Sequence, residues 1–247
     1  MTKLWEKNEL GFALLWIAIY VTGNSLSAQL SDTLGIKYCA TTVFNLCASL
    51  FLFFWIRKYG LMGRYGLCKA ALPGRRLLWY IPLVILASKN LWNGVAAGLS
   101  ATDTVLSACN MVGVGFLEEL LFRGFLFRAV SRNGVKTGII ISSISFGLGH
   151  MVNLVNGRGM SLAENLWQVS FAVAFGFLFV TLFYRGGTLW PCILTHAAFN
   201  ITSLFSKEVD FTLPAQMLQN AATLLLIVGY TWLAAKTPTK PDQEQSP

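Results

Sequence analysis

Charged residues are scarce in this chain of 247 residues: Asp, Glu, Lys and Arg make up 12%, whereas hydrophobic residues make up 55%. A soluble domain carries about twice that charged fraction. The deficit excludes an ordinary soluble protein. It predicts an all-α, polytopic integral membrane protein, since a chain in lipid must satisfy its backbone hydrogen bonds within its own segments.

Several compact catalytic and metal-binding motifs are also missing. The five cysteines are scattered without a CxxC pair, which excludes a disulfide scaffold and a cysteine-rich zinc site. No HExxH and no GxSxG motif is present, so neither a compact zinc-protease site nor a serine nucleophile elbow is indicated. The net charge of +8 does not indicate a nucleic-acid partner, because the basic residues fall mainly in short loops, where they set membrane topology.

Long apolar runs fill the remainder of the chain and predict about eight membrane-spanning helices in a single membrane domain, residues 1–247. The N-terminal spans lie within residues 10–99, and the tail 236–247 is polar, so we expect it to be disordered. A signal peptide is the alternative for the first span, because Ser25-Leu26-Ser27 resembles a cleavage site. The predicted spans cover about residues 10–30, 38–56, 77–99, 104–128, 135–152, 166–184, 191–205 and 214–235.

Basic residues divide unequally between the two sides of the predicted bundle. With a cytoplasmic N-terminus, fourteen Lys and Arg residues fall on the cytoplasmic side and three on the other. Because short cytoplasmic loops are enriched in Lys and Arg, both termini are predicted to be cytoplasmic.

Two adjacent acids and an arginine, Glu118, Glu119 and Arg123, lie inside the fourth apolar run. One charged residue at the centre of a span costs roughly 2.5–3.5 kcal/mol, so three cost on the order of 8–10 kcal/mol unless they pair or face a polar cavity. Glu119 and Arg123 are spaced i, i+4 in the favourable acid-first order, which is typical of a structural ion pair. Glu118 has no such partner on its own helix, and we interpret it as a working carboxylate.

The only two histidines, His150 and His196, also fall within predicted spans, and Asn200 follows His196 by one helical turn. Measured at about 1.5 Å per residue from the cytoplasmic basic residues Arg132, Lys136 and Arg185, Glu118 and His150 lie about 21 Å deep, His196 about 16 Å and Asn200 about 22 Å. We therefore expect the four to converge on one layer. A carboxylate can take a proton from water, a histidine can orient that water or stabilise an oxyanion, and an amide can donate to the same oxygen. Ligation of a metal such as Zn²⁺ by Glu118, His150 and His196 is an open alternative.

Three motifs in chain order carry a family resemblance. They are Glu118-Glu119-x-x-x-Arg123, Phe146-x-x-x-His150 and His196-x-x-x-Asn200. Together they resemble the signature of the CPBP family, which comprises CAAX prenyl endopeptidases and bacteriocin-processing (Abi) membrane proteins. The resemblance covers about residues 104–205.

The resemblance implies eight helices around a polar cavity inside the bilayer, and an intramembrane endopeptidase that cleaves a peptide or a membrane-associated protein there. Glu118 and His150 would activate water, while His196 and Asn200 would stabilise the oxyanion or, in a metalloprotease mechanism, help to bind a metal. A metal-independent glutamate mechanism is equally compatible with these residues.

Supporting roles follow from the same resemblance for Glu119, Arg123 and Phe146. We expect a bacterial inner (plasma) membrane as the location. An alternative is a non-proteolytic immunity or scaffold protein with the same fold. A proton-coupled transporter is less favoured, because no internal sequence repeat is present.

Overall fold

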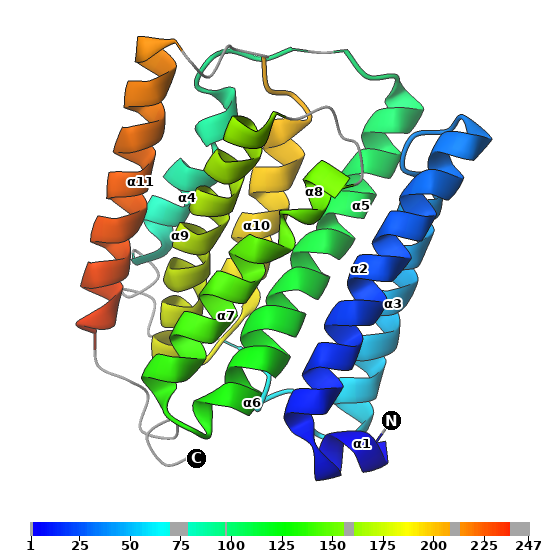
Figure 1. The fold of residues 1–247 in the computed structure, drawn as a ribbon, viewed down its shortest axis with the longest axis vertical. Coiled ribbons are helices and arrows are strands. Elements are labelled where there is room, and N and C mark those ends of the chain that lie inside the picture. Colours follow the sequence, from blue (N-terminus) through cyan, green and yellow to red (C-terminus); the bar gives the residue numbers. More distant parts are fainter. Residues whose placement is uncertain (1, 70–78, 97, 156–160, 208–212, 238–247) are drawn as a thin grey trace. The chain divides into compact units, whose positions relative to one another are not determined.

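The computed structural model describes residues 2–69, 79–96, 98–155, 161–207 and 213–237, and Figure 1 shows its helices. Within these ranges the regular elements are helices, with one isolated antiparallel bridge between Val95 and Ser206. The all-α class is thus confirmed. The elements are α1 (Thr2–Lys7), α2 (Glu9–Leu34), α3 (Cys39–Lys58), α4 (Ile81–Ala87), η2 (Lys89–Leu91), α5 (Ala101–Glu119), η3 (Leu120–Leu126), α6 (Phe127–Ser131), α7 (Val135–Gly149), α8 (Val152–Val155), α9 (Leu162–Gly186), α10 (Trp190–Ser203) and α11 (Pro214–Ala235).

Six helices among the described residues are long and apolar enough to cross a membrane. They are α2, α3, the continuous helix Ala101–Ser131, Val135–Leu154, α9 and α11. This composition indicates a polytopic membrane protein. The count of eight spans and the polar cavity stay predictions, and the predicted disorder of the tail falls largely on residues 238–247, outside the described ranges.

The predicted third span, residues 77–99, is wrong as a continuous helix. Residues 77 and 78 lie outside the described ranges, and from residue 79 onward α4 ends at Ala87 and is followed by the 3₁₀ turn η2. The side chain of Asn90 donates to the Phe199 carbonyl of α10 at 2.7 Å, and Thr202 Oγ1 donates to the Ala87 carbonyl at 2.8 Å. Side chains of η2 and α10 thus donate to backbone carbonyls of α10 and α4. In a longer helix, the Ala87 carbonyl would accept a hydrogen bond from within the helix.

The chain divides into two compact units. Unit 1 comprises residues 1–13, 122–187 and 209–247, and unit 2 comprises residues 14–121 and 188–208. A single membrane domain over residues 1–247 stays a prediction, and each unit is described by itself.

In unit 2, α5 is packed against both α3 and α10. Glycines on α5 permit the close approach: a Cβ on Gly113 would lie 2.9 Å from Asn45 Cβ of α3, and a Cβ on Gly115 would lie 2.9 Å from the Ala197 backbone nitrogen of α10. In Figure 1, α2 and α3 run in opposite directions, whereas α3 and α5 run the same way. Gly115 lies about one turn before the end of α5, so the last turn of α5 lies beside α10.

In unit 1, α9 is packed against α7 and α11. A Cβ on Gly176 of α9 would lie 2.8 Å from Ser143 Cα of α7, so α7 and α9 are in close contact there. Ser161 and Glu164 form a capping box at the start of α9, and Gly187 ends it in the left-handed conformation (φ 70°). These local signals fix where α9 begins and ends.

Candidate active site

The last turn of α5 presents two carboxylates in unit 2. Glu119 is fully buried, whereas the side chain of Glu118 keeps 16% of its surface exposed. Successive residues of an α-helix point about 100° apart, so the two acids face different surroundings. Glu118 is thus the accessible acid and Glu119 the enclosed one.

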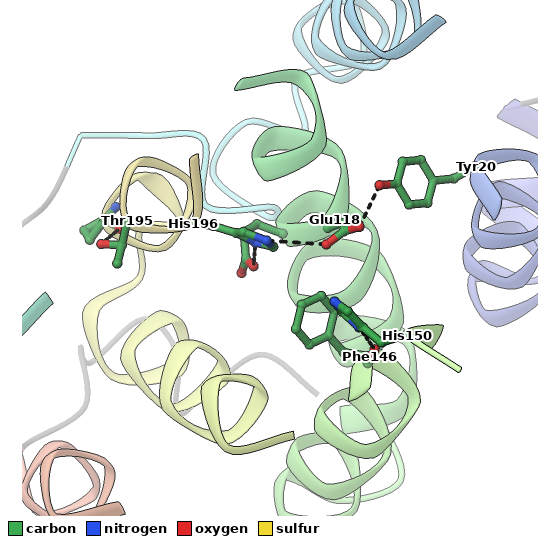
Figure 2. A network of polar contacts seen from close by, with 8 residues as sticks. Tyr20, Glu118, Phe146, His150, Thr195 and His196 are labelled. Atoms are coloured by element: carbon green, nitrogen blue, oxygen red, sulfur yellow. Dashed lines mark hydrogen bonds and ion pairs between the residues drawn. The ribbon is translucent and has the colours of Figure 1, made fainter. Parts of the chain in front are cut away.

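His196 of α10 contacts both acids, and Figure 2 shows its contact with Glu118. Its Nδ1 is 2.8 Å from Glu119 Oε1, and its Nε2 is 3.5 Å from Glu118 Oε2. An ionised carboxylate only accepts hydrogen bonds, so Nδ1 carries a hydrogen. In the doubly protonated form both N–H groups face a carboxylate. Glu119 therefore fixes the ring, and Nε2 is directed at Glu118.

Tyr20 of α2 reaches the other oxygen of Glu118 (Figure 2). Its hydroxyl donates to Glu118 Oε1 at 2.6 Å, and the residue is 7% exposed. Tyr20 was not predicted as a site residue, because one tyrosine in an apolar span does not by itself indicate a functional site. The polar residues Asn24, Ser27 and Ser31, which follow Tyr20 at helical spacing, indicate that this face of α2 is polar.

Asn200 follows His196 by one turn of α10 and is half-buried. Its predicted role as an amide donor to the oxyanion stays a prediction, as do the catalytic roles of Glu118, His150 and His196.

His150 ends α7 in unit 1. Its Nδ1 is 3.1 Å from the Phe146 carbonyl, and its own carbonyl accepts from Asn165 Nδ2 of α9 at 3.0 Å. Since a carbonyl only accepts, Nδ1 carries the hydrogen, and the neutral ring keeps a lone pair on Nε2. Asn165 is buried and was not recognised in the sequence. Asn165 lies directly before the predicted span 166–184, whereas α9 already begins at Leu162, so an earlier start of this helix is the signal that could have found it.

Arg123 and Phe146 form a stack beside His150 in unit 1. The Arg123 guanidinium lies 3.9 Å from the centroid of the Phe146 ring, and the rings of Phe146 and His150 meet edge to face at 5.1 Å. Arg123 is fully buried and belongs to η3, a π-helical stretch. A π-helix has wider turns than the α-helix assumed for the spacing of Glu119 and Arg123, and their ion pair stays a prediction.

The matches to known proteins concern the same part of the chain. Residues 100–202 match the family model described as Type II CAAX prenyl endopeptidase Rce1-like. Over these residues the chain matches the Rce1-like CAAX prenyl endopeptidase family, which confirms the resemblance there. The members of this family are proteases, so the prediction of a CAAX-protease-like enzyme is confirmed at the level of the family. No curated protein and no solved structure matches the chain.

The Rce1-like match covers some of the site residues and leaves out Tyr20. It begins at Ser100, whose side chain caps α5, and ends in α10. The match thus includes all seven residues that carry the sequence resemblance. It does not include α2, which supplies Tyr20.

Of the three predicted zinc ligands, Glu118 and His196 meet in unit 2. A catalytic zinc site uses three protein ligands, whereas the engaged pair in unit 2 is the Glu118 carboxylate and His196 Nε2. Among the residues that the structure describes, no three His, Cys, Asp or Glu side chains are grouped to hold a metal ion. Glu118 and His196 by themselves therefore do not make up a zinc site, and the set Glu118, His150 and His196 stays a prediction.

Proposed function

We propose that this Rce1-like protein is an intramembrane endopeptidase that hydrolyses a peptide bond of a peptide or membrane-associated protein. The family match supports peptide-bond hydrolysis. The observation that carries the assignment to these residues is the placement of His196 between Glu118 and Glu119. The second acid, Glu119, orients the imidazole, so that Nε2 is held beside Glu118 as a directed hydrogen-bond donor.

In the proposed mechanism, Glu118 takes a proton from a water molecule as the water oxygen attacks the scissile carbonyl. His150 accepts the second hydrogen of the same water at Nε2 and orients it. General-base catalysis of this kind contributes about 10²–10⁴-fold. The protonated Glu118 then passes its proton to the leaving amine as the carbon–nitrogen bond breaks.

The negative oxygen of the tetrahedral intermediate requires hydrogen-bond donors. His196, with hydrogens on both ring nitrogens, donates from Nε2, and Asn200 donates from its amide. One such donor is worth about 10²–10³-fold in rate. Glu119 orients His196, and Arg123 and Phe146 support His150. No step uses a metal.

The proposed topology places both termini in the cytoplasm of a bacterial inner membrane, and the substrate segment enters from that side. The excess of basic residues on one side supports it.

Substitution of Glu118 tests the proposal. We expect Glu118→Ala to abolish cleavage of peptide and membrane-protein substrates by purified protein in liposomes, because the base is removed. Asp103→Asn is the matched control, since it removes another carboxylate of α5, in its first turn, and should leave cleavage intact. Size-exclusion profiles and melting temperatures establish that both variants are folded.

Unchanged proteolysis in Glu118→Ala would contradict the assigned role. Failure of the wild-type protein to cleave, together with cellular phenotypes that survive substitution of Glu118 and His150, would favour the non-proteolytic immunity or scaffold function. Metal analysis and cleavage with and without a chelator test the metal-independent mechanism, for which we expect no loss of activity.

A further inference from the structure

Glu118 is engaged on both of its oxygens, by side chains from two different helices of unit 2. Tyr20 of α2 donates to Oε1 at 2.6 Å, and His196 of α10 lies 3.5 Å from Oε2. A carboxylate offers about four lone-pair sites. Two contacts from separate helices fix the plane of the carboxylate and leave sites for water.

The tyrosine hydroxyl is suited to orienting a base without competing for its proton. With an ordinary pKa of about 10, a phenol is neutral at pH 7 and donates a hydrogen to a carboxylate. Tyr20 is 7% exposed, so its ring has little freedom to move. A donor from a rigid position sets the direction of Oε1 through the reaction.

Three asparagines connect α2, through α3, to the helix that carries Glu118. Asn45 Nδ2 of α3 donates to Asn110 Oδ1 of α5 at 2.8 Å and to Asn24 Oδ1 of α2 at 3.1 Å. Asn24 lies one turn from Tyr20, and Asn110 lies about two turns before Glu118. We call Asn24, Asn45 and Asn110 the asparagine clasp. Hydrogen bonds between amide side chains of neighbouring helices contribute to helix association in membranes.

We propose that Tyr20 is a positioning residue that fixes the Glu118 carboxylate, so that the active site of this chain includes α2, outside the residues matched by the family model. The inference rests on the proposed function of Glu118 as the base. The competing explanation is a hydroxyl that only satisfies a buried polar group and contributes to stability.

Substitution of Tyr20 separates these explanations. Tyr20→Phe removes one oxygen and keeps the ring, and Tyr230→Phe changes another buried tyrosine, on α11. A misplaced catalytic group costs up to about 100-fold in rate. We expect Tyr20→Phe to lower kcat at least about tenfold with KM within about twofold of wild type. Tyr230→Phe should leave both constants unchanged.

Two further measurements test the contact itself and provide for a Tyr20→Phe variant that does not fold. The infrared band of the Glu118 carboxyl group, isolated as the difference between wild type and Glu118→Gln, should shift in Tyr20→Phe. If Tyr20→Phe does not fold, 3,5-difluorotyrosine at position 20 preserves the ring and the hydroxyl but changes its acidity, and should shift the same band and lower kcat.

The outcomes distinguish this inference from the proposed function. If Glu118→Ala is inactive but Tyr20→Phe has wild-type kcat, the inference is wrong and the proposed function stands. A lower melting temperature with unchanged kcat would likewise overturn it in favour of the structural explanation. If wild-type protein cleaves nothing, the proposed function fails, and an infrared band unmoved by Tyr20→Phe would overturn the positioning contact as well.

Discussion

The two units accommodate charge within apolar helices in different ways. In unit 2, the acids of α5 are met by directed polar groups, the His196 ring and the Tyr20 hydroxyl. In unit 1, two arginines lie over aromatic rings. Arg123 is 3.9 Å from the centroid of Phe146, and Arg128 is 4.8 Å from the centroid of Phe183.

The difference follows from the chemistry of the two charges. A carboxylate concentrates its charge on two oxygens and needs donors in fixed directions, whereas a planar guanidinium spreads its charge and stacks on ring faces. A carboxylate can also gain and lose a proton, which an arginine in a protein does not do. We therefore expect substitutions in unit 2 to change the chemistry and substitutions of the arginines to change mainly stability.

The largest effect expected from this comparison is that of Glu119→Gln. The variant keeps the shape of the side chain but removes the charge that orients His196 through Nδ1. Loss of an orienting partner of this kind typically costs about 10–100-fold, and we expect kcat to fall by that amount while the melting temperature changes little.

A double substitution tests whether Glu119 acts through His196. Residues that act as one unit give non-additive losses, so Glu119→Gln combined with His196→Gln should be no slower than His196→Gln alone. Additive losses would show that Glu119 acts independently of the histidine.

The next effect concerns the arginines of unit 1. Arg123→Lys replaces a planar, fully buried guanidinium by a compact ammonium over Phe146, and a desolvated cation–π contact is worth about 2 kcal/mol. We expect a loss of about 2 kcal/mol in the free energy of unfolding in detergent micelles. Arg128→Lys is the matched control, because Arg128 is half-buried and further from its ring, and should lose less than about 1 kcal/mol. Equal losses for the two variants would contradict the importance of the closer stack.

The smallest effect concerns a polar group that the fold keeps neutral. Burial, with a smaller contribution from nearby Cys192, raises the pKa of Tyr80 from 10.0 to about 12. Because the folded pKa lies above the unfolded one, this contribution to stability is complete below pH 10 and is lost between about pH 10 and pH 12. Tyr80→Phe should reduce the fall in melting temperature over that window. Tyr59→Phe, at an exposed tyrosine, should leave it unchanged.

Local signals in the sequence predict most helix ends. Pro214 begins α11, and Gly187 adopts the left-handed conformation that ends α9. At α5 the sequence favours Asp103 as the N-cap, but the cap is Ser100, one turn earlier, whose hydroxyl accepts from the Asp103 backbone N–H at 3.1 Å. Both residue types favour this position, so composition alone does not decide between them.

The partners of the site residues could not be read from the sequence. The i, i+4 rule gave Glu119 a partner on its own helix, whereas the contact that orients His196 comes from another helix and depends on how α5 and α10 are rotated. Rotation is set here by glycines such as Gly115, whose missing side chain lets α10 approach. No spacing rule within one helix contains that information.

The first span shows the same limit. Its sequence leaves open whether it is a signal peptide or a retained helix, since both are apolar runs. Tyr20 contacts Glu118, and cleavage after Ser27 would remove Tyr20 from the protein. A signal peptide and a retained helix therefore differ in whether this contact is kept. We therefore expect active protein to retain α2.

The π-helical stretch Leu120–Leu126 directly follows the two acids. Such a stretch contains one residue more than an α-helical path of equal length. Deletion of one residue within this stretch would therefore leave an α-helical path of about the same length. Deletion of one residue within the α-helical part of α5 has a different consequence: it would turn Glu118 and Glu119 by about 100° about the helix axis, away from His196 and Tyr20.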